Sequence, residues 1–358
     1  MDNLYKETKY ILNKYGIQAN KSLGQNFLIN EEVVDTIISK ADINKEDLVI
    51  EIGPGLGTLT SKLLEKAGRV ICIELDNRMI QILNDRFKLY NNFELIHDDI
   101  LKVDLNNIIN KFLAQQNNCM GLTLGRPVTT EESTKEYTEI NNSKTLKNAK
   151  IVANLPYYIT TPIIMKLLEE KINVQSITVM IQKEVADRLV EIPGGKNAGA
   201  ITYSVYYYAE AEKVIDVENN SFIPEPNVKS TVIKLINRNE PPVSVKDKEL
   251  MFKIIKQAFM QRRKTLVNAL SNLNMFNSKE DITNMIKEIG IDEKIRGEAL
   301  TLEQYAKIAD NIKNNIKNLY LYYNIHNYKI NCVCKKNIEN KINYHKRLKI
   351  PKCSFRTK

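Results

Sequence analysis

The chain has 358 residues with 43% hydrophobic content and no Trp, which is enough for two domains with a sizeable core. No apolar run approaches the ~18 residues of a membrane span, the start lacks a signal-peptide core, and five scattered cysteines fit a reducing compartment, so we expect a cytoplasmic protein with no membrane partner. Residues 313–358 hold 12 of the 52 basic side chains and one of the 43 acidic ones, which leaves 40 basic and 42 acidic side chains in residues 1–312, so a nucleic-acid surface there must be a local patch.

Apolar periodicity predicts that helices and strands alternate along the first half of the chain. Expected helices cover residues 4–15, 31–41, 58–67, 77–87, 161–170 and 182–191, and expected strands cover 48–52, 70–74, 93–96, 150–153 and 175–181. This alternation is typical of an α/β fold with a doubly wound parallel sheet. The runs 203–217 and 229–236 predict a late antiparallel pair of strands.

Composition divides the chain into further segments. Residues 114–148 are rich in Thr, Asn, Glu and Lys without a clean period, which predicts an inserted mobile loop. Later helices are expected over 248–258, 264–273, 279–289 and 301–312. We therefore expect an α/β domain over 1–240, a small helical domain over 241–312, and a basic low-complexity tail over 313–358 without a stable fold.

A glycine-rich turn follows the strand expected at 48–52. Gly53, Gly55 and Gly57 precede a helix, where glycine allows close backbone approach to a ligand at the carboxyl edge of a parallel sheet. Glu74 ends the next strand, 21 residues after Gly53, close to the spacing at which an acid reaches ribose hydroxyls. The turn lacks the G-x-G-x-x-G step and contains Pro54, so it is not the dinucleotide fingerprint. Alone, Glu74 would be a solvated acid at a strand end, and the preceding turn favours ligand binding.

The strand expected at 150–153 ends in Asn154, Leu155, Pro156 and Tyr157. An amide oxygen and a backbone carbonyl can accept the two N–H bonds of an exocyclic amine on a base, and an aromatic ring can pack against the base. Proline fixes the backbone between these groups. The alternative is a plain strand end that runs into a turn.

Six motifs in this order resemble those of the ribosomal RNA adenine dimethyltransferase family. They are 21–28 (KSLGQNFL), 51–57 (EIGPGLG), 73–76 (IELD), 153–158 (ANLPYY), 221–228 (SFIPEPNV) and 258–264 (AFMQRRK). The resemblance covers residues 5–312 except the insert at 114–148. It implies a Rossmann-like methyltransferase domain, a helical C-terminal domain and S-adenosylmethionine as the methyl donor.

The resemblance also assigns cofactor-binding residues. It places Asn26 and Leu28 in a motif that covers the cofactor, and Gly53 and Gly55 beside its methionine part. It implies that Glu74 binds the ribose. It implies further that Asp99 lies near the adenine of the cofactor and that Asn154 lies between cofactor and substrate. Because Asp98 precedes Asp99, the assignment of that acid could shift by one residue.

The same motifs suggest how an adenine could be held. The Asn154 oxygen and the carbonyl of Leu155 or Pro156 would accept the N6 hydrogens and stabilise positive charge that develops on nitrogen. Tyr157 would face a flipped-out base, and Phe222, expected at a stiff loop tip, would clamp its other face. The alternative for Phe222 is core packing.

Basic residues supply candidate RNA contacts, with simple solvation as the alternative. Arg262, Arg263 and Lys264 form a cluster at an expected helix start, and Lys183 and Arg188 are further candidates. We expect no metal site, because the spacing of the late His and Cys residues fits no standard pattern; these are His326, Cys332, Cys334, His345 and Cys353.

The expected activity is N6 dimethylation of two adjacent adenines in 16S rRNA by a monomer. The partner would be that rRNA within the small ribosomal subunit or its precursor. One alternative is the related methyltransferase of 23S rRNA that gives macrolide resistance, and another is a noncatalytic RNA-binding assembly factor.

Overall fold

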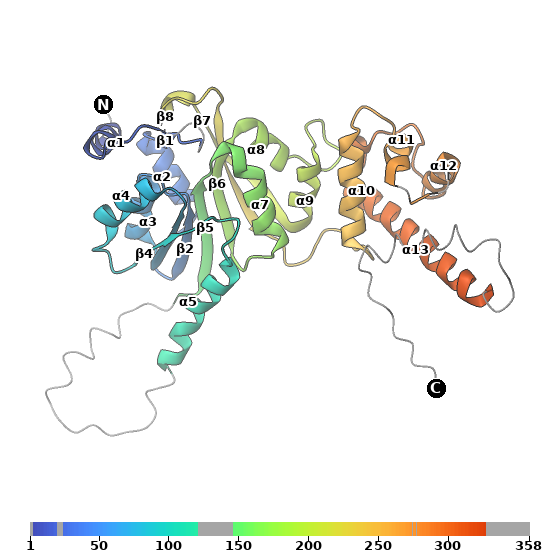
Figure 1. The fold of residues 1–358 in the computed structure, drawn as a ribbon, viewed down its shortest axis with the longest axis horizontal. Coiled ribbons are helices and arrows are strands. Elements are labelled where there is room, and N and C mark those ends of the chain that lie inside the picture. Colours follow the sequence, from blue (N-terminus) through green and yellow to red (C-terminus); the bar gives the residue numbers. More distant parts are fainter. Residues whose placement is uncertain (1–2, 20–23, 121–145, 274, 277, 327–358) are drawn as a thin grey trace, which may run out of the picture.

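The computed structural model describes residues 3–19, 24–120, 146–273, 275–276 and 278–326. Its centre is a seven-stranded sheet in the order β4-β3-β2-β5-β6-β9-β7 (Figure 1). The strands are β2 (Asp47–Ile52), β3 (Arg69–Glu74), β4 (Phe93–His97), β5 (Asn148–Asn154), β6 (Ser176–Gln182), β7 (Ala209–Val217) and β9 (Ser230–Asn237). Strands β2 to β6 pair in parallel, whereas β9 runs antiparallel to both β6 and β7. The predicted α/β class, with a mostly parallel sheet, is confirmed.

Helices cover both faces of the sheet because its central strands are apolar on both sides. One face holds α1 (Asn3–Lys14), α2 (Glu31–Lys40), α3 (Thr58–Lys66) and α4 (Asn77–Phe87). The other face holds α5 (Leu105–Met120), α7 (Thr160–Glu169), α8 (Lys183–Leu189) and α9 (Ala200–Tyr208). In β2, Leu48 and Ile50 join the core of the second face and Val49 joins that of the first, as strand geometry requires.

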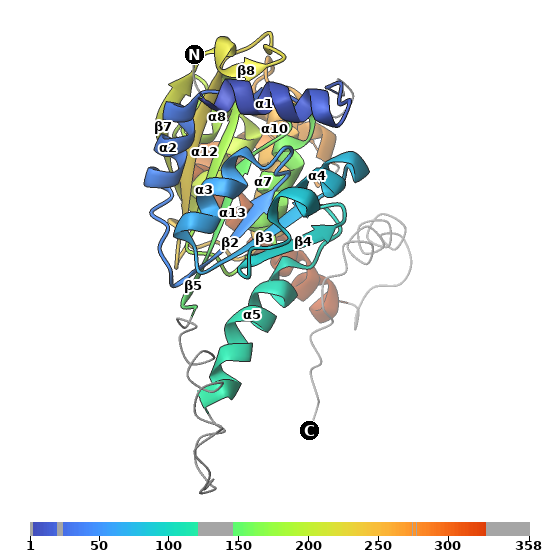
Figure 2. The same cartoon turned by 90° about the vertical axis from the view of Figure 1, so that its left-hand side faces the viewer.

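A small second sheet brings the N-terminal segment to the carboxyl edge of the large one. Strand β1 (Phe27–Leu28) pairs antiparallel with β8 (Phe222–Ile223), so that Phe27 lies opposite Ile223. Helix α1 lies near β8 at this edge (Figure 2). The Arg86 guanidinium of α4 pairs with Glu7 of α1 and donates to the Leu56 carbonyl. The N-terminal helix is thereby tied to the glycine turn.

The C-terminal helices form a cluster beside the β7 end of the sheet (Figure 1). They are α10 (Lys248–Met260), α11 (Leu266–Leu270), α12 (Lys279–Glu288) and α13 (Leu302–His326), with a 3₁₀ turn at Gly297–Ala299. Tyr203 of α9 is fully buried in this cluster, and its hydroxyl donates to the Leu300 carbonyl at 2.6 Å. Helix α9 therefore connects the cluster to the sheet.

The expectations for residues 203–217, for the loop at 114–148 and for the tail at 313–358 are each wrong in part. Residues 203–208 are helical, because a helix directs Tyr203 toward Phe259 and Tyr207 toward Phe252, with ring centroids 5.5 and 5.3 Å apart. Helix α5 occupies the start of the expected loop at 114–148, of which 121–145 lie outside the described residues.

Helix α13 also continues past residue 312 into the expected tail. Lys313 explains the first added turn, since it pairs with Asp247, the N-cap residue of α10. The rest of the tail, 327–358, lies outside the described residues.

A buried ion pair joins the starts of β2 and β5. Lys150 Nζ lies 2.9 Å from Asp47 Oδ2, and both side chains are almost fully buried. The Asn44 N–H also donates to this carboxylate oxygen at 2.8 Å, and Lys150 donates to the Asp42 carbonyl. Because the pair sits where the parallel register begins, it contributes to the placement of both strand ends.

Replacing Lys150 with Met should lower the free energy of unfolding by about 3 kcal/mol, because the Asp47 carboxylate would stay buried without its counter-charge. Urea denaturation at neutral pH measures this. Lys147→Met is the matched control, because Lys147 pairs with Glu46 at the exposed surface and should change stability by less than about 1 kcal/mol. Equal effects of the two variants would contradict a special role for the buried pair.

A candidate active site at the carboxyl edge of the sheet

A cavity of about 1090 Å³, including solvent at its mouth, lies at the carboxyl ends of β2, β3 and β5. Its walls come from the segments 24–28, 51–56, 73–76, 98–100 and 154–159. These segments contain most of the motifs that the sequence singled out. Parallel strands bring them together because all their carboxyl ends meet at one edge.

The glycine turn forms the floor of this cavity. Gly53, Gly55 and Gly57 have φ values of 64°, 58° and 83°, which disfavour side chains other than glycine. A Cβ on Gly53 would meet no atom within 4 Å, whereas one on Gly57 would lie 2.3 Å from the Phe87 ring. Gly53 therefore leaves open space for a ligand, and Gly57 allows the turn to pack on α4.

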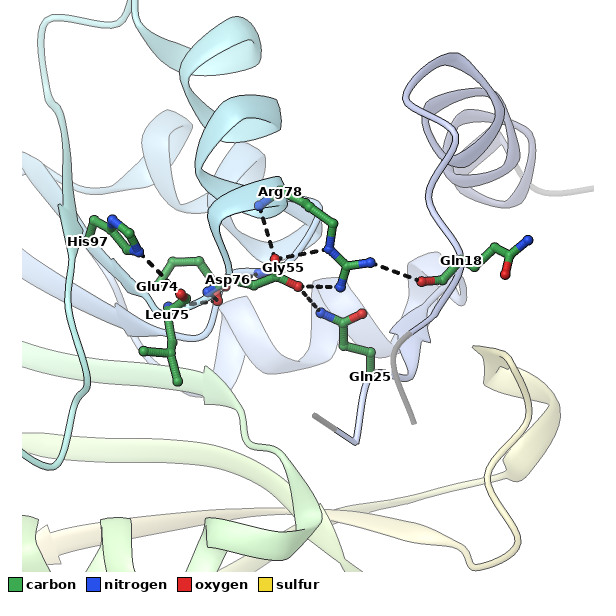
Figure 3. A network of polar contacts seen from close by, with 8 residues as sticks. All are labelled: Gln18, Gln25, Gly55, Glu74, Leu75, Asp76, Arg78 and His97. Carbon is green, nitrogen blue, oxygen red and sulfur yellow. Dashed lines mark hydrogen bonds and ion pairs between the residues drawn. The ribbon is translucent and has the colours of Figure 1, made fainter. Parts of the chain in front are cut away.

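Glu74 stands at the end of β3 and is only 9% exposed. Its carboxylate accepts the N–H groups of Gly55 at 3.2 Å, Leu75 at 2.8 Å and Asp76 at 2.9 Å (Figure 3). Burial raises the pKa of Glu74, and these backbone hydrogen bonds oppose the rise. The arrangement fixes an acceptor group at the cavity wall, where it suits hydroxyl donors.

Asp98 and Asp99 both line the cavity. Asp98 is exposed and accepts the Asp99 N–H at 2.7 Å. The Asp99 side chain is 27% exposed, accepts the Leu101 N–H at 3.0 Å, and lies 3.8 Å from Lys102. Asp99 is the less solvated of the two.

Asn154 ends β5 at the centre of the site. Its Nδ2 donates to the Asn26 carbonyl at 3.4 Å, which directs Oδ1 away from that carbonyl. The Pro156 carbonyl already accepts the Ile159 N–H at 3.3 Å and the Thr160 hydroxyl at 3.0 Å. Of the two carbonyls considered from the sequence, that of Leu155 is therefore the better acceptor for a ligand.

Tyr157 and Tyr158, which follow Pro156, also line the cavity. The Tyr157 hydroxyl lies 2.6 Å from the Ser230 hydroxyl, which anchors the ring to β9. Tyr158 is 52% exposed, and a Cβ on Gly24 would come within 3.3 Å of its ring. Tyr158 thus forms part of the cavity mouth.

The expected position of Phe222 is wrong. Its side chain is 2% exposed, packs in the core with α1 to α4, and belongs to β8 rather than to a loop tip. Pairing of β8 with β1 buries the ring, so in this structure it offers no open face to a base. The other cofactor candidates named from the sequence, Asn26 and Leu28, line the cavity.

None of the candidate RNA-binding residues lines the cavity. Arg262, Arg263 and Lys264 are exposed in the turn after α10, not at a helix start, and Arg262 pairs with Glu298. Lys183 lies 2.8 Å from Asp216, and Arg188 pairs with Glu184.

Glu51 is a site residue that the sequence reading missed. It lines the cavity, is 1% exposed, and accepts the Thr60 hydroxyl at 2.6 Å and the Cys72 thiol at 3.4 Å. Burial raises the pKa of Glu51 to about 7, although both hydrogen bonds oppose the rise. The available signal was an acid inside the apolar run 48–52 of β2.

Among the described residues, no three His, Cys, Asp or Glu side chains gather as a metal-binding group. The late Cys residues and His345 lie outside the described residues, as does the side chain of His326. Within the same part of the chain, no helix is long and apolar enough to cross a membrane.

Comparisons with known proteins point to one family. A family model described as Ribosomal RNA adenine dimethylase matches residues 16–314. Ribosomal RNA small subunit methyltransferase A of Clostridium botulinum is 47% identical over 303 residues, which are 85% of this chain and 97% of that protein. A protein of the same name from Clostridium acetobutylicum is 45% identical over 305 residues, 85% of this chain and 98% of that one.

Two solved structures share the fold. A dimethyladenosine transferase from Plasmodium falciparum has a TM-score of 0.60 and 26% identity, and the match covers 82% of this chain and 98% of that one. The 23S rRNA methyltransferase ErmE has a TM-score of 0.54 at 20% identity, covering 80% and 100%, which shows a shared fold alone.

Replacing Glu51 with Gln should flatten the pH dependence of stability. Since the pKa of Glu51 is raised from 4.5 to about 7, the folded protein keeps a proton that the unfolded chain releases between these pH values. The contribution of Glu51 to stability is therefore full below pH 4.5, falls as pH rises to 7, and is lost above it. The total change is about 3 kcal/mol.

Urea unfolding from pH 4.5 to 8 measures this effect. The variant should gain stability relative to the native protein as pH rises through the window. Glu65→Gln, on the exposed side of α3, is the control and should leave the slope unchanged. An identical pH slope in Glu51→Gln and the native protein would show that Glu51 does not titrate there.

Proposed function

The chain belongs to the ribosomal RNA adenine dimethylase family, and on this premise we propose that it transfers methyl groups from S-adenosylmethionine to N6 of two adjacent adenines near the 3′ end of 16S rRNA. The observation that carries the proposal is the placement of the Asn154 amide and the Leu155 carbonyl beside a cavity whose walls suit that donor. The substrate would be this rRNA within the small ribosomal subunit or its precursor, in the cytoplasm, and the enzyme would act as a monomer.

The cavity fits S-adenosylmethionine in three respects. Open space above Gly53 lets a ligand approach the backbone, and the Glu74 carboxylate can accept ribose hydroxyls. Asp99 can accept from an adenine amine, while the buried side chain of Ile100 beside it offers an apolar surface to the ring. Once bound, the donor would supply an electrophilic methyl group; the protein must supply position and charge.

Positioning matters because the lone pair of an adenine N6 amine is delocalised into the ring. The Asn154 Oδ1 and the Leu155 carbonyl would accept its two hydrogens and turn it toward tetrahedral geometry. Both acceptors would also stabilise the positive charge that builds on nitrogen. Tyr157, anchored through Ser230, would pack on the base after it leaves its stack.

The RNA-binding role of Arg262, Arg263 and Lys264 remains a proposal that rests on their exposure beside the C-terminal helices. Exposed cations of this kind contact phosphates and position the RNA without reading its sequence. We propose that the helical part from 241 onward acts as a domain that presents them. Lys183, Arg188 and Arg262 are weaker candidates than Arg263 and Lys264, because all three already take part in ion pairs with acids.

Two other functions fit the chain less well. The 23S rRNA methyltransferase type shares the fold, but the chain is 45–47% identical to the two proteins named for the small subunit and 20% identical to ErmE. A noncatalytic assembly factor would have no need of the Asn154 amide and an open glycine turn at one cavity, both of which this chain retains.

Replacing Asn154 with Ala should lower kcat on the order of 100-fold, because one acceptor for the developing positive charge is lost. Methylation of small ribosomal subunits that lack dimethyladenine, with a tritiated donor, measures kcat. Asn173→Ala is the matched control, since Asn173 is exposed in the loop before β6. An unchanged kcat in Asn154→Ala would remove Asn154 from the chemistry.

The choice of rRNA can be tested directly. Isolated small and large ribosomal subunits, incubated separately with the protein and donor, should yield dimethyladenine in the small subunit alone. Mass spectrometry of RNase fragments should then locate two adjacent modified adenines. Modification of the large-subunit RNA would support the 23S alternative instead.

A further inference from the structure

Three consecutive residues, Gly24–Asn26, cross the mouth of the cavity and contact both of its sides. Gly24 lies against the Tyr158 ring, and the Asn26 carbonyl accepts the Asn154 amide at 3.4 Å; Asn154 ends β5 and Tyr158 follows it. Between them, Gln25 Nε2 donates to Asp76 Oδ2 at 2.9 Å, after β3 (Figure 3). Since β2 separates β3 from β5, this segment, the strap 24–26, bridges the cavity.

Asp76 is held firmly in place. Its side chain is 8% exposed and caps α4 by accepting the Arg78 N–H at 3.0 Å. The Arg78 guanidinium pairs with the same carboxylate at 2.6 Å and also reaches the Gln18 carbonyl at 3.5 Å. Arg78 lowers the pKa of Asp76, so the group is a carboxylate at neutral pH.

Asp76 also touches the cofactor wall. Its backbone N–H donates to Glu74 Oε1 at 2.9 Å, the same carboxylate that would accept the ribose hydroxyls. One residue therefore contacts the strap through its side chain and the ribose-binding acid through its backbone. Loss of the Gln25 hydrogen bond can therefore shift Asp76 and, through its backbone N–H, the Glu74 carboxylate.

We propose that the hydrogen bond from Gln25 to the Asp76–Arg78 pair is a latch that holds the strap across the cavity and so sets the affinity for the methyl donor. The inference rests on the proposed function, and Gln25, Asp76 and Arg78 are positioning residues in it. When the latch is lost, fewer molecules hold the strap in place, and the apparent Kd rises in inverse proportion to that fraction.

The test is titration of the full-length protein with S-adenosylhomocysteine, without RNA, in a calorimeter. Gln25→Ala should weaken binding by about tenfold, the size expected for one hydrogen bond to a charged acceptor. Gln25→Glu should weaken it further, because its carboxylate would face that of Asp76. Gln25→Lys should bind nearly as well as the native protein, because an ammonium group can donate to Asp76.

Gln175→Ala is the matched control, since Gln175 is exposed at the opposite edge of the sheet and should leave Kd unchanged. Thermal unfolding of every variant without ligand separates a binding effect from a loss of fold, and the proposal expects similar melting temperatures. If the native protein binds and both Gln25→Ala and Gln25→Glu have the same Kd as the native protein, the latch is wrong while the proposed function stands. If the native protein does not bind S-adenosylhomocysteine at all, both fail.

Discussion

Parallel pairing of β2 with β5 is the constraint on which the site depends. The two strands begin with the buried pair of Asp47 and Lys150, 103 residues apart, and end with the glycine turn and Asn154. Because their register is fixed at the start, their carboxyl ends reach one edge together. The space above Gly53 and the Asn154 amide are neighbours for this reason alone, since no local sequence signal connects them.

The chemistry of the cavity follows from its acids and their burial. Glu51 and Glu74 are withdrawn from water, and the pKa of each rises, while hydrogen bonds from the chain keep them oriented. Asp76, beside them, has a lowered pKa because of Arg78. The cavity wall thus holds two acids with raised pKa values beside one with a lowered pKa. This combination suits a ligand that carries both hydroxyl and cationic groups.

The N-terminal segment completes the site from a distance in sequence. Pairing of β1 with β8 brings it to the carboxyl edge, and contacts with α4 through Arg78 and Arg86 hold it there. The same pairing buries Phe222, so the aromatic surface at the mouth comes from Tyr157 and Tyr158 instead. The sequence shows which residues are aromatic. Their exposure depends on strand pairing, because Phe222 is buried where β8 pairs with β1.

The sequence by itself determined the alternating elements from 31 to 191, the cavity candidates from Asn26 to Asn154, and the family, because short motifs and apolar periods are local properties. Tertiary structure decided what depends on distant partners. It made residues 203–208 helical through Phe252 and Phe259, and it engaged the Pro156 carbonyl so that Leu155 is the freer acceptor. It also joined Gln25 to Asp76. Burial and hydrogen-bond partners arise from packing between remote segments, which periodicity does not record.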